Sequence, residues 1–113
     1  PLDSDNPAIQ TYVAKYKEMF PKASVGTHSL MGYSAGAVFC EALAKCGPEP
    51  TREKLVKALE SMTKFDQKIG PPITFEPVKA GPYARRGQTA VVIVQLKDGK
   101  FQSLGDFMDP VRK

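Results

Sequence analysis

The segment with the clearest chemical pattern is Gly32-Tyr33-Ser34-Ala35-Gly36, which matches the G-x-S-x-G nucleophile elbow of serine hydrolases. In that elbow the glycines allow a strained turn between a strand and a helix, which exposes the serine oxygen. The histidine of such enzymes follows the serine, but His28 precedes Ser34 and no other histidine exists. Residues 26–29 are also too polar for the preceding strand. We therefore interpret the glycines as small residues of a tightly packed helix, with a truncated serine hydrolase as the alternative.

No other set of residues predicts catalysis or a cofactor. One histidine and two cysteines do not supply the four ligands of a zinc site, and neither glycine-rich phosphate-binding pattern occurs. The pair Arg85-Arg86 could contact an anion, but its glycine- and proline-rich surroundings favour a solvated loop. We therefore expect no catalytic residue, no metal and no cofactor.

The two cysteines, Cys40 and Cys46, fall in a stretch with helical spacing of its apolar residues. Six helical residues separate two side chains by about 120° around the axis and about 9 Å along it. A disulfide needs Cα atoms within about 7 Å of each other. We therefore expect no bond between these two cysteines. They are either small buried residues, or one of them pairs with a cysteine outside this chain.

Two helices are predicted to carry the residues named so far. Asn6, followed by proline, is typical of a helix start, and apolar residues at helical spacing continue over about 7–20. A second apolar period runs from near Leu30 to Cys46, where Gly47-Pro48 ends it. Because of its small and apolar residues, we expect this second helix to be more buried than the first.

The remaining elements are a short helix and β structure. Thr51 is expected to cap a third helix, and residues 73–75 form a candidate strand. Glycines and prolines across 76–88 predict a long loop. Residues 89–107 predict a β-hairpin, since Asp98-Gly99 between two apolar runs is a strong turn signal.

Composition restricts the class of protein. With 113 residues, 42% hydrophobic and 25% charged, the chain is neither disordered nor fibrous, and its net charge of +4 is below that usual for dedicated nucleic-acid binders. Helices without a sheet and a lone hairpin leave an α/β architecture incomplete. The chain also starts at Pro1, without Met or a signal-like segment. We therefore expect a fragment of a larger protein, with self-association as a possible consequence.

Several segments carry a family resemblance through their order along the chain. They are Tyr12 to Pro21, Gly32-Tyr33-Ser34-Ala35-Gly36 through Glu41-Ala42-Leu43, Thr51 to Glu60 (T-R-E-x-L-x-x-A-L-E), Gly70 to Pro77, and Gln88 to Phe101. Together they resemble the branched-chain amino acid-type substrate-binding proteins of ABC transporters, which are type I periplasmic binding proteins similar to the Leu/Ile/Val-binding proteins. The resemblance covers essentially the whole chain.

The resemblance implies a fold and a division of the chain. Members have two α/β lobes joined by three crossovers, with a small ligand between the lobes. This chain would be an α/β fragment of that fold, namely three helices followed by a C-terminal β-hairpin. Residues 1–80 would be the helical part of the first lobe, and residues 81–113 the last crossover loop and the hairpin of the second lobe.

The resemblance also implies a function. The chain would belong to a non-enzymatic, periplasmic solute-binding component of an ABC importer, made with a signal peptide, which captures an amino acid or organic acid and delivers it to a membrane permease. A ligand-sensing receptor domain of the same fold is the alternative. Tyr33 is the one ligand-binding residue carried over, and a packing role competes with it. An oxidising compartment would favour a disulfide from Cys40 or Cys46 to absent chain.

Overall fold

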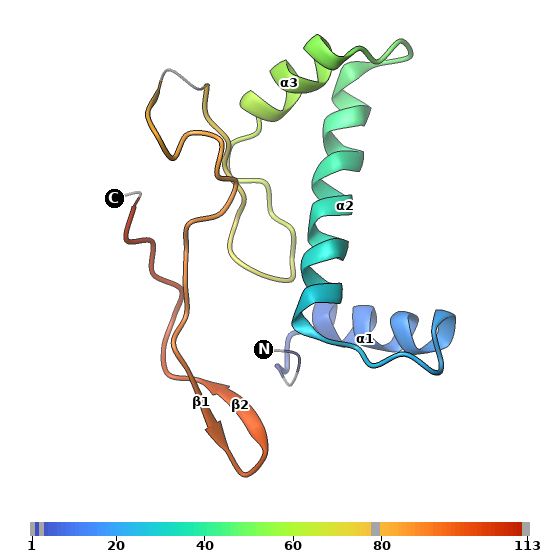
Figure 1. The fold of residues 1–113 in the computed structure, drawn as a ribbon, viewed down its shortest axis with the longest axis vertical. Helices are drawn as coiled ribbons and strands as arrows, with labels where there is room; N and C mark the ends of the chain where they lie inside the picture. The colour runs from blue at the N-terminus through green and yellow to red at the C-terminus, as the bar shows by residue number, and fades with distance from the viewer. Residues whose placement is uncertain (1, 3, 78–79, 112–113) are drawn as a thin grey trace.

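The computed structural model describes residues 2, 4–77 and 80–111, and all statements of structure concern these residues. Within them the chain forms the helices α1 (Pro7–Met19), α2 (Thr27–Cys46) and α3 (Arg52–Glu60), then the strands β1 (Val94–Lys97) and β2 (Lys100–Ser103) (Figure 1). The strands pair as one antiparallel sheet. The predicted α/β fold of three helices followed by a hairpin is confirmed.

Helix α1 begins as its sequence predicts. The Asn6 side-chain oxygen accepts a hydrogen bond of 2.8 Å from the Ala8 N–H, and Pro7 occupies the first turn. The helix ends at Met19, one residue short of the predicted end and two residues before Pro21. Ile9 and Tyr12 on its apolar face are buried. This face lies across the N-terminal end of α2 (Figure 1).

Helix α2 begins at Thr27, about three residues before the predicted start near Leu30. The Gly26 N–H donates to Ser29 Oγ at 3.1 Å, and the Ser29 hydroxyl donates to the Gly26 carbonyl at 2.7 Å. These hydrogen bonds stabilise the first turn of α2. The turn consists mostly of polar residues, so hydrophobic periodicity alone does not predict it. The helix ends at Cys46, and Gly47 follows with a φ of 75°.

Helix α3 packs against the C-terminal part of α2 and forms the core with it. The Thr51 side chain caps α3 by accepting from the Lys54 N–H at 3.2 Å, as predicted. The buried cluster contains Val38, Ala42, Cys46, Ala58, Met62 and Ile73. The N-terminal half of α2 is different, since Met31 and Tyr33 are 64% and 53% exposed. The expectation that the second helix is more buried throughout is therefore wrong for this half.

The segment between α3 and the hairpin is irregular. The predicted strand 73–75 is reduced to one bridge, in which Phe65 and Ile73 exchange backbone hydrogen bonds of 2.8 and 2.9 Å. The next two N–H groups bond elsewhere, Thr74 to the Gly87 carbonyl and Phe75 to the Met62 carbonyl. Because successive residues pair with different segments, no ladder forms. Residues 78 and 79 of the predicted loop 76–88 lie outside the described residues, and the rest forms neither α-helix nor strand.

The hairpin turns where the sequence predicts. Asp98 and Gly99 both have positive φ, 52° and 76°, as a type I′ turn requires. Its regular strands are shorter than the predicted 89–107, although a bridge between Val91 and Met108 extends the pairing. Val94, Leu96 and Phe101 share one face of the hairpin, and every residue of both strands is exposed.

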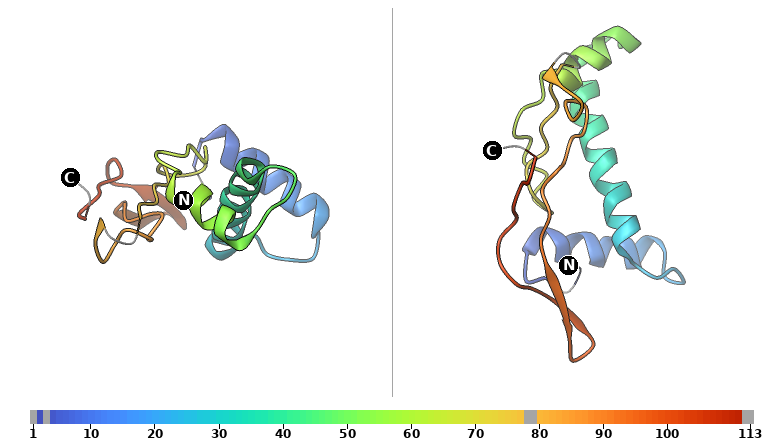
Figure 2. Two further views of the ribbon diagram at one scale, coloured as in Figure 1. Left: turned by 90° about the horizontal axis from the view of Figure 1, so that it is seen from above. Right: turned by 60° about the vertical axis from the view of Figure 1, so that its left-hand side comes forward.

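The molecule is extended for its length. In two views the helices lie on one side, and the irregular segment and hairpin lie on the other (Figures 1 and 2). The radius of gyration is 16.0 Å, whereas a compact chain of this length has about 13 Å. The accessible surface is 8344 Å², about 2,200 Å² above the roughly 6,100 Å² of a compact 12.3 kDa protein. None of the described helices is both long and apolar enough to span a membrane.

Candidate functional site

Two hollows lie beside the N-terminal half of α2. The first, here named the α2 groove, has a volume of about 600 Å³. It lies between α2, the irregular segment, and Val92 and Phe107 next to the hairpin strands. The second, the α1–α2 cavity, has a volume of about 580 Å³ and lies where α1 crosses α2. Ser34 lines the groove and Tyr33 lines the cavity, while Gln67 and Ile69 line both. Tyr33 and Ser34, which are consecutive in the G-x-S-x-G segment, therefore line different hollows.

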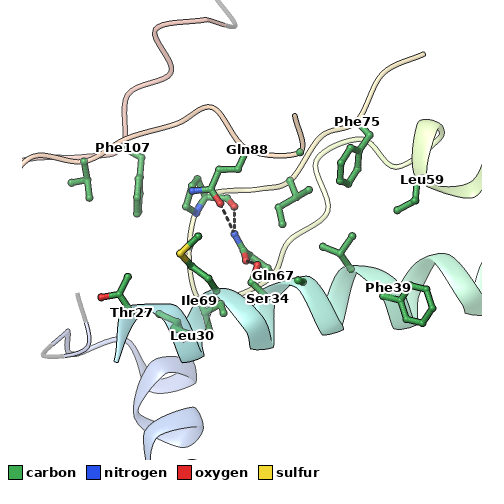
Figure 3. Close-up of a pocket in the computed structure, with 18 residues that line it drawn as sticks. Thr27, Leu30, Ser34, Phe39, Leu59, Gln67, Ile69, Phe75, Gln88 and Phe107 are labelled. Atoms are coloured by element: carbon green, nitrogen blue, oxygen red, sulfur yellow. Dashed lines mark hydrogen bonds between the residues drawn. The ribbon is translucent and has the colours of Figure 1, made fainter. Parts of the chain in front are cut away.

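Most residues that line the α2 groove are apolar, and a cluster of polar side chains lies among them. In Figure 3, Gln67 lies between Ser34 on α2 and Gln88 on the opposite segment. The Ser34 hydroxyl donates to Gln67 Oε1, and Gln67 Nε2 donates to the Pro71 carbonyl at 2.7 Å and to Gln88 Oε1 at 3.4 Å. The Gln67 side chain, only 8% exposed, is thus satisfied by neutral groups.

The geometry of Ser34 does not support a hydrolase. Ser34 lies inside α2 rather than at a turn between a strand and a helix, so the elbow that would expose its oxygen is absent from this part of the chain. Its hydroxyl donates to an amide oxygen, which does not act as a general base. The tight packing expected around Gly32 and Gly36 is also not found, since a Cβ at either position would meet no atom within 4 Å.

The α1–α2 cavity has an aromatic wall. The ring of Tyr33 lies 5.0 Å from that of Tyr12, which lies 5.8 Å from Tyr16, and Tyr16 lies 5.2 Å from Phe20, all measured between ring centroids. These separations suit tilted aromatic packing. All four residues line the cavity, and Tyr33 is 53% exposed. The ring of Tyr33 is therefore packed against α1 on one side and accessible from the cavity on the other.

The polar groups of the cavity differ in whether they have partners. Tyr12 is 6% exposed, and its buried hydroxyl has no hydrogen-bond partner among the described residues. Lys15 forms no ion pair with any described residue, whereas Lys68 pairs with Asp66 outside the cavity lining. The hydrogen bond from Lys68 lowers the pKa of the Asp66 carboxyl. Lys15 therefore supplies the unpaired positive charge of this cavity.

The cysteines and the pair Arg85-Arg86 show no arrangement that supports catalysis or ligand binding. Cys46 is buried, Cys40 is exposed, and both are free, so the prediction that they do not pair is confirmed. Arg85 forms an ion pair of 2.9 Å with Glu60, and Arg86 stacks 4.9 Å from the centroid of Tyr83. Among the described residues no cluster of His, Cys, Asp and Glu could hold a metal ion.

Sequence reasoning named Tyr33 but missed its surroundings. Tyr12 and Tyr16 belong to the apolar residues predicted at helical spacing over 7–20, and their spacing of four residues is the signal that places two rings together. Gln67 gave no signal, because it lies in an irregular segment without periodicity. Lys15 belongs to the charged residues of this helix, which hydrophobic periodicity leaves outside the apolar face, yet in the structure it lines the cavity.

Comparison with protein families identifies the family of the chain. A family model described as "Periplasmic binding protein" matches residues 1–100. Searches of curated proteins and of solved structures found no match. The family match indicates a solute-binding role and an extracytoplasmic location, and such proteins are generally not enzymes. Since the match covers most of the chain and agrees with its α/β elements, the chain belongs to the periplasmic binding protein family.

Proposed function

We propose that these residues are the C-terminal part of a two-lobed, type I solute-binding component of an ABC importer. The single observation that carries the proposal is the family match over residues 1–100. Residues 1–80 would belong to the first lobe, and residues 81–113 would form the last crossover and the hairpin of the second lobe. The branched-chain amino acid specificity rests on the resemblance of the sequence motifs alone.

The surface of the chain supports its membership of a larger fold. The excess of about 2,200 Å² over a compact protein exceeds the roughly 800 Å² that one partner contributes to a standard interface. Exposed apolar residues lie along the α2 groove and the hairpin, among them Met31, Phe39, Leu96 and Phe101. We infer that the groove receives the sheet of the first lobe, which would cover α2.

The proposed mechanism is capture by closure. The two lobes would move about the crossovers, and a solute that contacts both lobes would stabilise the closed state. The permease in the membrane would then recognise that state and accept the solute. Tyr33 is the proposed solute contact in this chain, because its exposed ring lies beside a cavity at the end of α2. The proposed solute is an amino acid or another small organic acid.

The test measures binding by the protein that contains both lobes. Its melting temperature is measured against the amino acids and a set of small carboxylic acids, and hits are titrated by calorimetry. Tyr33→Ala is expected to weaken binding at least tenfold, whereas Tyr83→Ala, which changes an exposed tyrosine outside both hollows, should leave it unchanged.

Three outcomes would change the proposal. If no amino acid or carboxylic acid binds, the solute-binding assignment fails. If Tyr33→Ala binds as wild type does, the assignment of Tyr33 fails. If the solute binds but the permease shows no transport of it, the sensing receptor of the same fold replaces the importer.

A further inference from the structure

We infer that Gln67 is a positioning residue that holds the hairpin arm, residues 89–111, in a fixed orientation relative to α2. It does so by joining Ser34 on α2 to Gln88 at the base of the arm (Figure 3). The inference deepens the proposed function, and it rests on that function only in taking the arm as part of the second lobe. Gln67 would then set the orientation of the two lobes before a solute binds.

The hairpin arm has no core of its own to fix its orientation. None of its residues is buried, and Phe107, which lines the α2 groove, is 49% exposed. Within the arm, Val91 and Met108 exchange backbone hydrogen bonds of 2.8 and 2.9 Å. The Thr89 hydroxyl donates to Asp109 Oδ2 at 2.7 Å. We therefore expect the arm to move as one ribbon, whose orientation is decided at its base.

The chain is fixed up to the residue before Gln88. The Thr74 N–H donates to the Gly87 carbonyl at 2.8 Å. Ala84 is 3% exposed, and Gly87 lies so close to Phe75 that a Cβ would meet its Cζ at 2.6 Å. Gln88 is thus the first residue beyond the packed segment, and a contact of its side chain acts at the point where the arm leaves the rest of the chain.

The segment that carries Gln67 is held at both ends. Lys64 and Lys68 have φ angles of 52° and 63°. This left-handed conformation is uncommon outside glycine and persists where the surrounding structure fixes it. The Lys64 N–H donates to Thr74 Oγ1 at 3.0 Å. The Lys68 carbonyl accepts from Asn6 Nδ2 at 2.9 Å. The segment therefore gives Gln67 a fixed support from which its side chain can position the arm.

The Gln67 amide connects three segments of the chain. Its Oε1 accepts from the Ser34 hydroxyl, and its Nε2 donates to the Pro71 carbonyl at 2.7 Å and to Gln88 Oε1 at 3.4 Å. Gln67 is 8% exposed, and a buried amide that loses a partner is destabilised. A side chain that stabilised only its own turn would need only the Pro71 bond. The bond to Gln88 is the longest, so we expect it to break first when the arm moves.

The test measures the orientation of the hairpin relative to the helices in the 113-residue chain. Residual dipolar couplings of the backbone amides, recorded in a weakly aligning medium, should fit one alignment tensor for α1–α3, β1 and β2. Gln88→Met removes the acceptor of the Gln67 amide and keeps a side chain of similar length. It should raise the population of the reoriented arm about two- to tenfold, as expected for one neutral hydrogen bond. The couplings of β1 and β2 should then fall by at least a fifth, and those of the helices should not change.

Variants separate positioning from stability. Gln88→Glu retains an acceptor and should restore the wild-type couplings, and Gln95→Met, which changes an exposed glutamine of β1, should not alter them. Ser34→Ala detaches Gln67 from α2 and should reduce the couplings of the arm as Gln88→Met does. The melting temperature of the helices, followed by circular dichroism, should stay the same in Gln88→Met, because Gln88 is exposed. A residue with only a stabilising role would lower this temperature without changing the couplings.

The two-lobed protein tests the consequence for the lobes. Small-angle X-ray scattering without solute should give a different radius of gyration for Gln88→Met than for wild type, because the lobes would no longer share one orientation. Gln88→Glu should scatter as wild type does. Identical scattering from all three proteins would overturn the inference for the lobes.

Several results in the 113-residue chain would overturn the inference. They are wild-type couplings in Gln88→Met, equal losses in Gln88→Met and Gln95→Met, and a loss in Gln88→Glu as large as that in Gln88→Met. If Phe107→Ala reorients the arm and Gln88→Met does not, apolar contact in the groove positions the arm instead. Failure here leaves the proposed function standing if the two-lobed protein binds a solute. If the couplings change as expected but no solute binds the two-lobed protein, the positioning role stands and the proposed function fails.

Discussion

The helical part of the chain and its hairpin arm contain similar proportions of apolar residues but bury them very differently. From α1 to Ile73 the chain contributes nearly all of its buried residues, centred on Ala42 and Met62 at 0% and 1% exposure. In the arm, residues 89–111, no residue is buried, although Val91, Ile93, Val94 and Leu96 follow one another closely.

The contrast shows which interactions each region depends on. The hairpin is specified by its turn, because Asp98 and Gly99 adopt the positive φ angles that the sequence signal predicts. A two-stranded sheet is marginal by itself. The helical part instead depends on long-range packing between α2, α3 and Ile73. We therefore expect the stability of the chain to reside in the helical part, and the following experiments test this.

The largest effect is expected from truncating a methionine in the core. Met62→Ala should lower the free energy of unfolding by about 2–5 kcal/mol, because it leaves a cavity among packed side chains. Met108→Ala, which removes the same atoms from a residue 51% exposed in the arm, should cost no more than about 0.5 kcal/mol. Urea unfolding followed by circular dichroism measures both. Equal losses would contradict the comparison.

A smaller effect is expected where the irregular segment meets the core. A Cβ at Gly87 would lie 2.6 Å from Phe75 Cζ and 2.9 Å from Ile73 Cγ2. Gly87→Ala should therefore destabilise by about 1–3 kcal/mol through overpacking. Gly36→Ala is the matched control, since its Cβ meets no atom within 4 Å and helix propensity should stabilise by about 0.5–1 kcal/mol. A stabilised Gly87→Ala would show that this contact is absent.

A local effect is expected in the hairpin turn. Gly99→Ala places a side chain at a φ of 76°, which costs about 1–2 kcal/mol in the left-handed region. Because the hairpin is exposed, this loss should appear as weaker cross-strand contacts between Leu96 and Phe101 in NMR. The urea midpoint of the helices should stay the same. A lowered midpoint would mean that the hairpin contributes to the common core.

The smallest effect concerns pH. The hydrogen bond from Lys68 holds the pKa of Asp66 below its ordinary value of 3.8. A depressed pKa means that the pair stabilises the folded chain above about pH 3.8, and that this contribution is lost as pH falls through the lowered pKa. NMR titration of the Asp66 carboxyl should show the depressed value, and Lys68→Met should return it toward 3.8. An unchanged value in Lys68→Met would rule out this cause.

Much of the fold followed from local signals, and much of the site did not. Asn6, Thr51 and Asp98-Gly99 marked the starts of helices and the turn correctly, because capping and turn chemistry act within a few residues. The candidate strand 73–75 failed, because strand formation depends on partners distant in sequence. The role of Gln67 in the α2 groove also depends on a partner distant in sequence, Ser34, so no local pattern predicts it.

Solute binding by the two-lobed protein, compared with binding by these 113 residues, tests the central proposal most directly. Calorimetric titration of both with the amino acids and small carboxylic acids is the measurement. We predict that at least one solute binds the two-lobed protein with micromolar affinity or better, and that none binds the 113-residue chain as tightly. The account is contradicted if no solute binds the two-lobed protein, or if the shorter chain binds one with equal affinity.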